Sequence, residues 1–301
     1  MTQAPFRPAA GGTAAEPVPA VPAPRSRPPL IVAGFDSSDH SRHALDRAAE
    51  EAVARGGTLE ILYGWPWDLL PPEPGAQGEA TTLFQRSRRV VDEAADRIRQ
   101  DHPDLPVVPV MTVEAAETAL ARRGRHAALT VVGTRGHGGF AGMLLGSVSL
   151  HVAAHTTGPL LVVRGDNART GHRVLVAVKS DLDREALRFA FEEARRRKAE
   201  LYALHVWQYP AFPEHAADAG TAEEVARFAV SALREEYPDV QVRTEPAVGP
   251  PARQLIEATR SADVVVLAAH RRRHRIGMQL GPVTHALLHH SHCPVAVIPA
   301  D

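Results

Sequence analysis

The sequence has a single cysteine, almost no excess charge and no long apolar run. Cys293 alone cannot form an intrachain disulfide, which is typical of a reducing compartment, so we expect a cytoplasmic protein. No stretch approaches the roughly 18 uninterrupted apolar residues of a membrane-spanning helix, and we expect no membrane partner. The formal net charge is −1, from 34 basic and 35 acidic residues, which gives no reason to expect a nucleic-acid partner.

The first 28 residues are rich in proline and alanine and poor in large apolar side chains. Such a segment cannot bury enough apolar surface to fold, so we predict a disordered tail over residues 1–28. It also lacks the basic start and apolar stretch of a secretory signal peptide. The rest of the chain is long enough for two domains of ordinary size.

The remainder of the chain repeats itself. The matching pairs are 31–52 with 174–194, 59–65 with 201–207, 129–149 with 264–284, and 156–164 with 291–299. Two long copies at one offset indicate a duplicated domain rather than a solenoid. We predict a first domain over 29–165 and a second over 171–300, joined by a short polar linker at 165–172.

Each copy alternates strand and helix patterns. In the first copy we predict strands at 30–35, 58–64, 106–112, 128–132 and 159–163, and helices at 39–55, near 80–101, near 114–124 and from 146. Continuous apolar strands such as ALTVV and PLLVV suit a parallel sheet covered on both faces. The sequence therefore predicts an α/β fold of two tandem doubly wound domains, each with a mostly parallel five-stranded sheet.

A loop with six glycines, at 133–146, follows the fourth predicted strand and precedes a helix. Open α/β sheets bind ligands at this edge, where glycines let backbone N–H groups approach an anion and the helix dipole favours negative charge. Ser147 adds a hydroxyl, and Arg135 and His137 add positive charge. The chemistry indicates a phosphate cradle, although the spacing matches neither a Walker A loop nor a dinucleotide fingerprint.

Gly133, Gly136, Gly146 and Ser147 have the spacing G-x2-G-x9-G-[S/T], and Asp36 directly follows the first strand. With these residues and the repeat, the chain resembles the universal stress proteins in their tandem two-domain form. The resemblance implies an α/β fold shared with adenine-nucleotide alpha-hydrolase-like proteins. It also implies a stress-response role and bound ATP, with Mg²⁺ or Mn²⁺ on the phosphates.

The same resemblance implies a set of nucleotide contacts in the first domain. Asp36 contacts the nucleotide, Gly64 lines the adenine pocket, and the glycine loop holds ribose and phosphates. The residues expected to bind ATP are Asp36, Gly64, Gly133, Thr134, Arg135, Gly136, His137, Gly146, Ser147 and Val148. One departure is Glu114, which stands where the family often has glycine and is expected to crowd or repel a nucleotide.

Two structural alternatives stay open for these residues. The loop can be a surface turn with Ser147 as a helix cap, and Asp36 can cap the helix that starts at residue 39. A third role, that of an enzyme, finds little support because no nucleophile elbow and no paired carboxylates are readable. We expect ATP hydrolysis to be slow at most, and a non-nucleotide scaffold is the remaining hypothesis.

The second copy has lost the cradle residues. Asp36, Gly133, Gly136 and Ser147 correspond to Lys179, Ala268, Arg271 and Pro282. Pro282 supplies neither a hydroxyl nor a backbone donor, although it suits a helix start. We therefore predict a degenerate nucleotide site in a domain that serves as scaffold. The resemblance implies that the last strands of the two domains pair in an internal pseudo-dimer, and a homodimer stays open.

Two other patterns suggest ligands. The cluster HRRRHR at 270–275 suits a phosphorylated ligand or a nucleic-acid backbone, but no aromatic residues interleave with it for base stacking. Histidines lie four apart at 151 and 155 and again at 285 and 289, yet no HExxH or third ligand is readable. We expect solvated surfaces and no metal site, and we expect Cys293 to be buried rather than reactive.

Overall fold

The computed structural model describes residues 28–65, 78–136, 144–164, 172–179, 183–207, 219–270 and 280–300. The predicted tail lies outside this part except for Pro28, and so do most of the predicted linker and most of the basic cluster at 270–275. Within the described residues, every helix is too short or too polar to cross a lipid bilayer.

The first domain alternates strands and helices as its sequence predicts. Its elements are β1 (Leu30–Phe35), α1 (Asp39–Arg55), β2 (Thr58–Gly64), α2 (Glu79–Asp101), β3 (Val107–Thr112), α3 (Ala116–Gly124), β4 (Leu129–Gly133), α4 (Ser147–His155) and β5 (Leu160–Val163). Local chemistry sets the ends of α1: the Ser38 side chain accepts a hydrogen bond from Ser41 N, and Gly56 ends the helix in the left-handed region at φ 59°.

The second domain repeats this order. Its elements are β6 (Arg173–Val178), α5 (Arg184–Arg197), β7 (Glu200–Trp207), α6 (Ala219–Glu236), β8 (Val242–Val248), α7 (Pro251–Ala258), η3 (Thr259–Ser261), β9 (Val264–His270), α8 (Pro282–His290) and β10 (Val295–Ala300). Pro251 and Pro282 each occupy the first turn of a helix, where the missing N–H is no loss.

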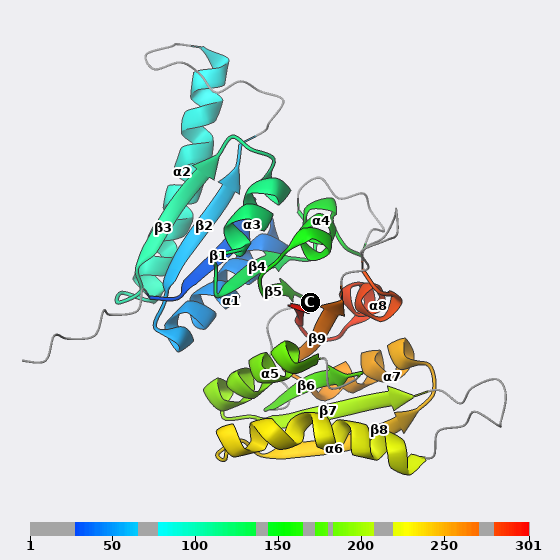
Figure 1. The fold of residues 1–301 in the computed structure, drawn as a ribbon. Coiled ribbons are helices and arrows are strands. Elements are labelled where there is room, and N and C mark those ends of the chain that lie inside the picture. Colours follow the sequence, from blue (N-terminus) through cyan, green and yellow to red (C-terminus); the bar gives the residue numbers. More distant parts are fainter. Residues whose placement is uncertain are drawn as a thin grey trace, which may run out of the picture.

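The strands of both domains form one sheet with the order β3-β2-β1-β4-β5-β10-β9-β6-β7-β8. Within each half all pairs are parallel, and the halves meet where β5 pairs antiparallel with β10, placing Leu161 opposite Ala296. Figure 1 shows the two halves on either side of this junction. The predicted fold of two mostly parallel five-stranded units is confirmed, and the expected pairing of the last strands is observed.

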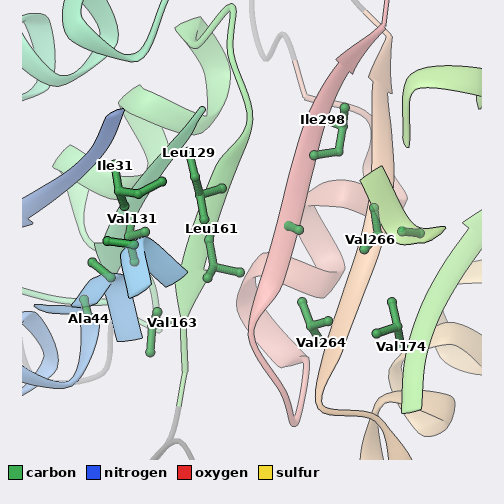
Figure 2. Packing of buried hydrophobic residues seen from close by; sticks show 14 of the residues in the cluster. Ile31, Ala44, Leu129, Val131, Leu161, Val163, Val174, Val264, Val266 and Ile298 are labelled. Carbon is green, nitrogen blue, oxygen red and sulfur yellow. The ribbon is translucent and has the colours of Figure 1, made fainter. Parts of the chain in front are cut away.

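Helices cover both faces of the sheet, and the buried core runs through both domains. On one face α1, α2, α5 and α6 pack over the strands, and on the other face α3, α4, α7 and α8 do so. In Figure 2 Leu161 on β5 lies on one side of the junction, and Ile298 on β10 lies on the other. These apolar side chains are almost fully buried, so the junction is part of one continuous core.

Two equivalent helices also meet through buried charges. Arg55 of α1 and Arg197 of α5 each contact both Glu51 of α1 and Glu193 of α5. Burial raises the pKa of the Glu51 carboxyl, but the guanidinium groups of Arg197 and Arg55 outweigh this effect and hold its pKa at about 2. Two of these ion pairs, Arg55 with Glu193 and Arg197 with Glu51, cross between the domains.

Candidate functional site

A cavity of about 380 Å³ opens at the carboxyl ends of β1, β2 and β4 in the first domain. The strand order reverses between β1 and β4, and this switch point is where open α/β sheets hold ligands. The lining residues are Gly34, Phe35, Asp36, Ser41, Leu62, Gly64, Ala116, Leu120, Val132, Gly133, Arg135, Gly136, Gly146, Ser147, Val148 and Ser149.

Asp36 is held rigidly at one side of this cavity. Its Oδ1 atom accepts hydrogen bonds from Ser38 N at 3.0 Å and Ser38 Oγ at 2.6 Å. Ser37 turns the chain between them with a φ of 69°, a left-handed conformation that a non-glycine residue rarely adopts. Because Ser38 is the N-cap of α1, the alternative in which Asp36 caps this helix is wrong.

Glycine is required in the cradle because the backbone and the Asp36 carboxylate lie too close for a side chain. A Cβ at Gly133 would lie 2.6 Å from His40 O, and a Cβ at Gly136 would lie 2.2 Å from Asp36 Oδ2. The far end of the loop returns to the residue after β4, where Gly146 N donates to Thr134 O at 2.6 Å. These contacts fix both described ends of the loop.

The N-terminus of α4 faces the same cavity. Gly146 is the N-cap and Ser147 is the first helical residue, so the alternative in which Ser147 caps the helix is wrong. Ser147 and Val148 line the cavity, which places the positive end of the helix dipole there. Arg135 and Asp36 also line the cavity, so one basic and one acidic residue lie at its wall.

Most of the predicted nucleotide contacts converge on this cavity, with two exceptions. Thr134 is 4% exposed and is absent from the described lining, while His137 lies outside the described residues. Glu114 does not crowd the site as expected, because its Oε1 atom pairs with Arg122 Nη2 at 2.8 Å and its side chain is not among the described lining residues.

The universal stress protein family matches the sequence twice, over residues 30–164 and over residues 171–299. The chain belongs to that family. Universal stress protein Rv1996 of Mycobacterium tuberculosis (strain ATCC 25618 / H37Rv) is 31% identical over 304 residues, which cover 90% of this chain and 96% of its own length.

Solved structures agree with the family at the level of the fold. A universal stress protein from Archaeoglobus fulgidus DSM 4304 has a TM-score of 0.68 at 16% identity and covers 90% of this chain and 98% of its own. A universal stress protein in complex with cAMP is 30% identical but covers 46% of this chain and 99% of its own, with a TM-score of 0.35.

The second domain of this universal stress protein arranges the same edge differently. In the first domain Asp36 N donates to Ser41 Oγ at 3.3 Å. In the second domain Lys179 N donates to Asp183 Oδ2 at 2.6 Å, so a carboxylate replaces the hydroxyl. The other oxygen of Asp183 lies 2.8 Å from Nε2 of His270, the last residue of β9, which aligns with Arg135 of the first domain.

Asp183 is 1% exposed, so its carboxylate occupies the interior of the edge rather than its rim. Sequence reasoning missed this residue, because the helices of the two copies align one residue out of step with their first strands. Aligning the two helices by themselves would have revealed Asp183. In that alignment HALDRAAEEA (43–52) matches EALRFAFEEA (185–194), and Ser41 matches Asp183. Arg271, the counterpart of Gly136, lies outside the described residues.

The two histidine pairs predicted from the sequence and Cys293 are not among the residues that line the cavity of this universal stress protein. The rings of His151 and His155 stack at 4.1 Å, and those of His285 and His289 lie 4.3 Å apart. Among the described residues no group of three or more His, Cys, Asp or Glu side chains is placed to hold a metal ion. Cys293 is buried, as predicted, and burial raises the pKa of its thiol to about 12.

Proposed function

We propose that this universal stress protein is an ATP-binding stress-response and signalling module with one nucleotide site. The site lies in the first domain (29–165), and the second domain (171–300) acts as its scaffold. The observation that carries the proposal is the cavity at the switch point, where Gly133 and Gly136 permit approaches that a Cβ would block.

The two ends of the cavity suit the two ends of a nucleotide. Apolar side chains such as Leu62, Leu120 and Val132 line one part, which fits a flat aromatic base. Arg135 and the N-terminus of α4 supply positive potential elsewhere, which fits phosphates. Asp36, held by Ser38, is an acceptor for the hydroxyl or amino hydrogens of a nucleoside.

A divalent cation would arrive with the phosphates rather than bind a preformed protein site. An ion of this kind is held mainly by phosphate oxygens and water. Such an ion would neutralise part of the phosphate charge. The residues of the chain would then need to supply only Arg135 and the amides at the start of α4.

Thermal unfolding with and without ATP tests the proposal. A ligand that binds only the folded state at 100 times its dissociation constant adds about 2.7 kcal/mol of stability. We expect MgATP to raise the midpoint of the wild-type protein, and to leave the Gly133→Ala/Gly136→Ala variant unchanged. Release of inorganic phosphate, measured in the same samples, separates a binding module from an ATPase, and we expect slow turnover at most.

A protein that unfolds at the same temperature with and without MgATP would contradict the nucleotide proposal and favour a scaffold without a ligand. A rise that persists in the glycine variant would place binding elsewhere in the molecule.

A further inference from the structure

Arg164 links the edge of the first-domain cavity to the second domain. Gly133 of β4 pairs with Val163 of β5, so Arg164 leaves the sheet beside the residues that follow Gly133. Its Nη1 atom donates to the carbonyl oxygen of Leu288 at 2.8 Å, in the last turn of α8. The final carbonyls of a helix lack partners within the helix, and a cation there also complements the helix dipole.

Several basic side chains interact electrostatically around this contact. Burial lowers the pKa of the Arg164 guanidinium, and the charge of Arg135 lowers it further. Burial and Arg135 also lower the pKa of His40, with Arg164 acting in the same direction and Asp39 opposing it. On the second-domain side, burial lowers the pKa of His289, and Arg164 contributes there too. Arg164 therefore lies within electrostatic reach of both the cavity and α8.

Resting on the proposed nucleotide site, we propose that Arg164 couples the phosphate end of the cavity to α8. In this coupling the number of phosphates on the bound nucleotide sets the strength of the contact between the domains.

The coupling follows from the position of Arg135 between the cavity and Arg164 along the electrostatic interactions described above. Arg135 lines the cavity, so phosphates bound there offset its charge and weaken its repulsion of Arg164. Each added phosphate strengthens this effect, and Arg164 is then held more firmly on Leu288 O. By thermodynamic reciprocity, the same coupling favours di- and triphosphates over monophosphates.

The second domain lacks this device. Aligned on the repeat, Pro299 stands at the position of Arg164 and His270 at that of Arg135. The first domain therefore contributes an arginine to the contact between the domains, and the second domain has no arginine at the equivalent position.

The test is calorimetric titration of the full chain with AMP, ADP, ATP and inorganic tripolyphosphate. Four proteins are compared: wild type, Arg164→Gln, Arg164→Lys, and the control Arg260→Gln, which removes an exposed arginine paired with Glu257 in the second domain. We expect Arg164→Gln to weaken ATP and tripolyphosphate about three- to tenfold, and AMP by less, as one lost charge at partly screened range would do. Arg164→Lys retains most of the preference for ATP, and Arg260→Gln matches wild type.

Amide hydrogen exchange of residues 285–291 measures how firmly the end of α8 is held, which is the expected effect of the coupling on the second domain. We expect ATP to slow exchange there more than AMP does in wild type, and neither to change it in Arg164→Gln. Thermal unfolding of each variant alone establishes that it is folded. A merely structural arginine would alter exchange equally with every ligand, so this readout separates coupling from packing.

The outcomes distinguish this inference from the proposed function. If wild type binds ATP but Arg164→Gln matches the control, or loses AMP and ATP affinity equally, the coupling is wrong and the nucleotide site stands. If wild type binds tripolyphosphate in an Arg164-dependent way but no nucleotide, the coupling stands and the nucleotide proposal fails. If wild type binds neither, both are wrong.

Discussion

The two domains have the same fold but opposite chemistry at the carboxyl edge of their sheets. In the first domain the hydroxyl of Ser41 accepts the backbone N–H after β1, and a cavity opens beside it. In the second domain the carboxylate of Asp183 accepts the equivalent N–H and also holds His270. One edge keeps space and a positively charged side chain beside it, while at the other edge the described carboxylate of Asp183 is paired with a backbone N–H and with His270.

The surfaces through which the two domains meet are alike in both copies. Glu51 and Glu193 are equivalent by the repeat, and each contacts the arginines of both helices. The strands β5 and β10 likewise contribute alike to one core. The two copies thus share the residues that join the domains and differ at the carboxyl edge of the sheet, and variants can test each half of this statement.

The largest expected effect comes from the shared region. Glu51→Gln leaves buried guanidinium groups without their carboxylate, and breaking a buried pair costs about 3–5 kcal/mol of unfolding free energy. Denaturant unfolding measures this loss. Glu50→Gln, at a side chain that is 41% exposed, is the matched control and is expected to change stability by less than about 0.5 kcal/mol. Equal effects of the two changes would show that the buried ion pairs do not join the domains.

The same carboxyl gives a pH dependence with a defined sign. The folded pKa of Glu51 is about 2, below its ordinary value of 4.5, so its contribution to stability is complete above that ordinary value. It is lost as pH falls from about 4.5 to about 2. As the solution is acidified, the unfolding free energy of Glu51→Gln should therefore fall less steeply than that of wild type. Equal slopes of unfolding free energy against pH in the two proteins would contradict the low pKa of Glu51.

The next effect separates the two glycine positions. Gly136→Ala places a methyl group against a carboxylate that Ser38 holds in place, and overpacking of this kind costs about 1–3 kcal/mol. We expect ATP affinity to fall by up to about a hundredfold. Gly281→Ala, where a Cβ meets nothing within 4 Å in the second domain, should leave ATP affinity unchanged. ATP affinities that stay equal in the two variants would mean that the glycine loop is not the cradle.

A smaller effect follows from copying the second-domain carboxylate into the first domain. Ser41→Asp brings a negative charge to the cavity wall, and we expect it to weaken ATP about tenfold more than the neutral Ser41→Asn does. Calorimetric titration of both variants measures the difference. If the two weaken ATP equally, size rather than charge distinguishes the edges.

The smallest effect is expected in the second domain itself. Asp183→Asn keeps an acceptor for Lys179 N but weakens the contact with His270, so we expect about 1 kcal/mol of lost stability. No nucleotide site should appear, because Ala268 and Pro282 still stand in place of the cradle residues. A second ATP site in this variant would show that Asp183 alone blocks binding.

The fold was readable from the sequence because each strand and helix carries its own pattern. The predicted helix at 39–55 and the strands at 30–35 and 58–64 have the observed bounds, since Ser38 and Gly56 mark the helix ends locally. The site was readable only in part. Residue types located the glycine loop, but the choice of partner for each polar side chain depends on tertiary contacts.

Three particulars show this limit. Asp36 contacts Ser38 rather than capping α1 itself, and Glu114 turns to Arg122 on α3 rather than into the cavity. The contact between Arg164 and Leu288 joins residues 124 positions apart, which no local pattern can predict. Side chains with several partners within reach are therefore where sequence reasoning fell short.

The asymmetry between the domains has one direct measurement, the stoichiometry of MgATP binding to the full chain by calorimetric titration. A single site per chain, abolished in the Gly133→Ala/Gly136→Ala variant, is the predicted result. Two sites per chain, or one site that survives in that variant, would contradict the account.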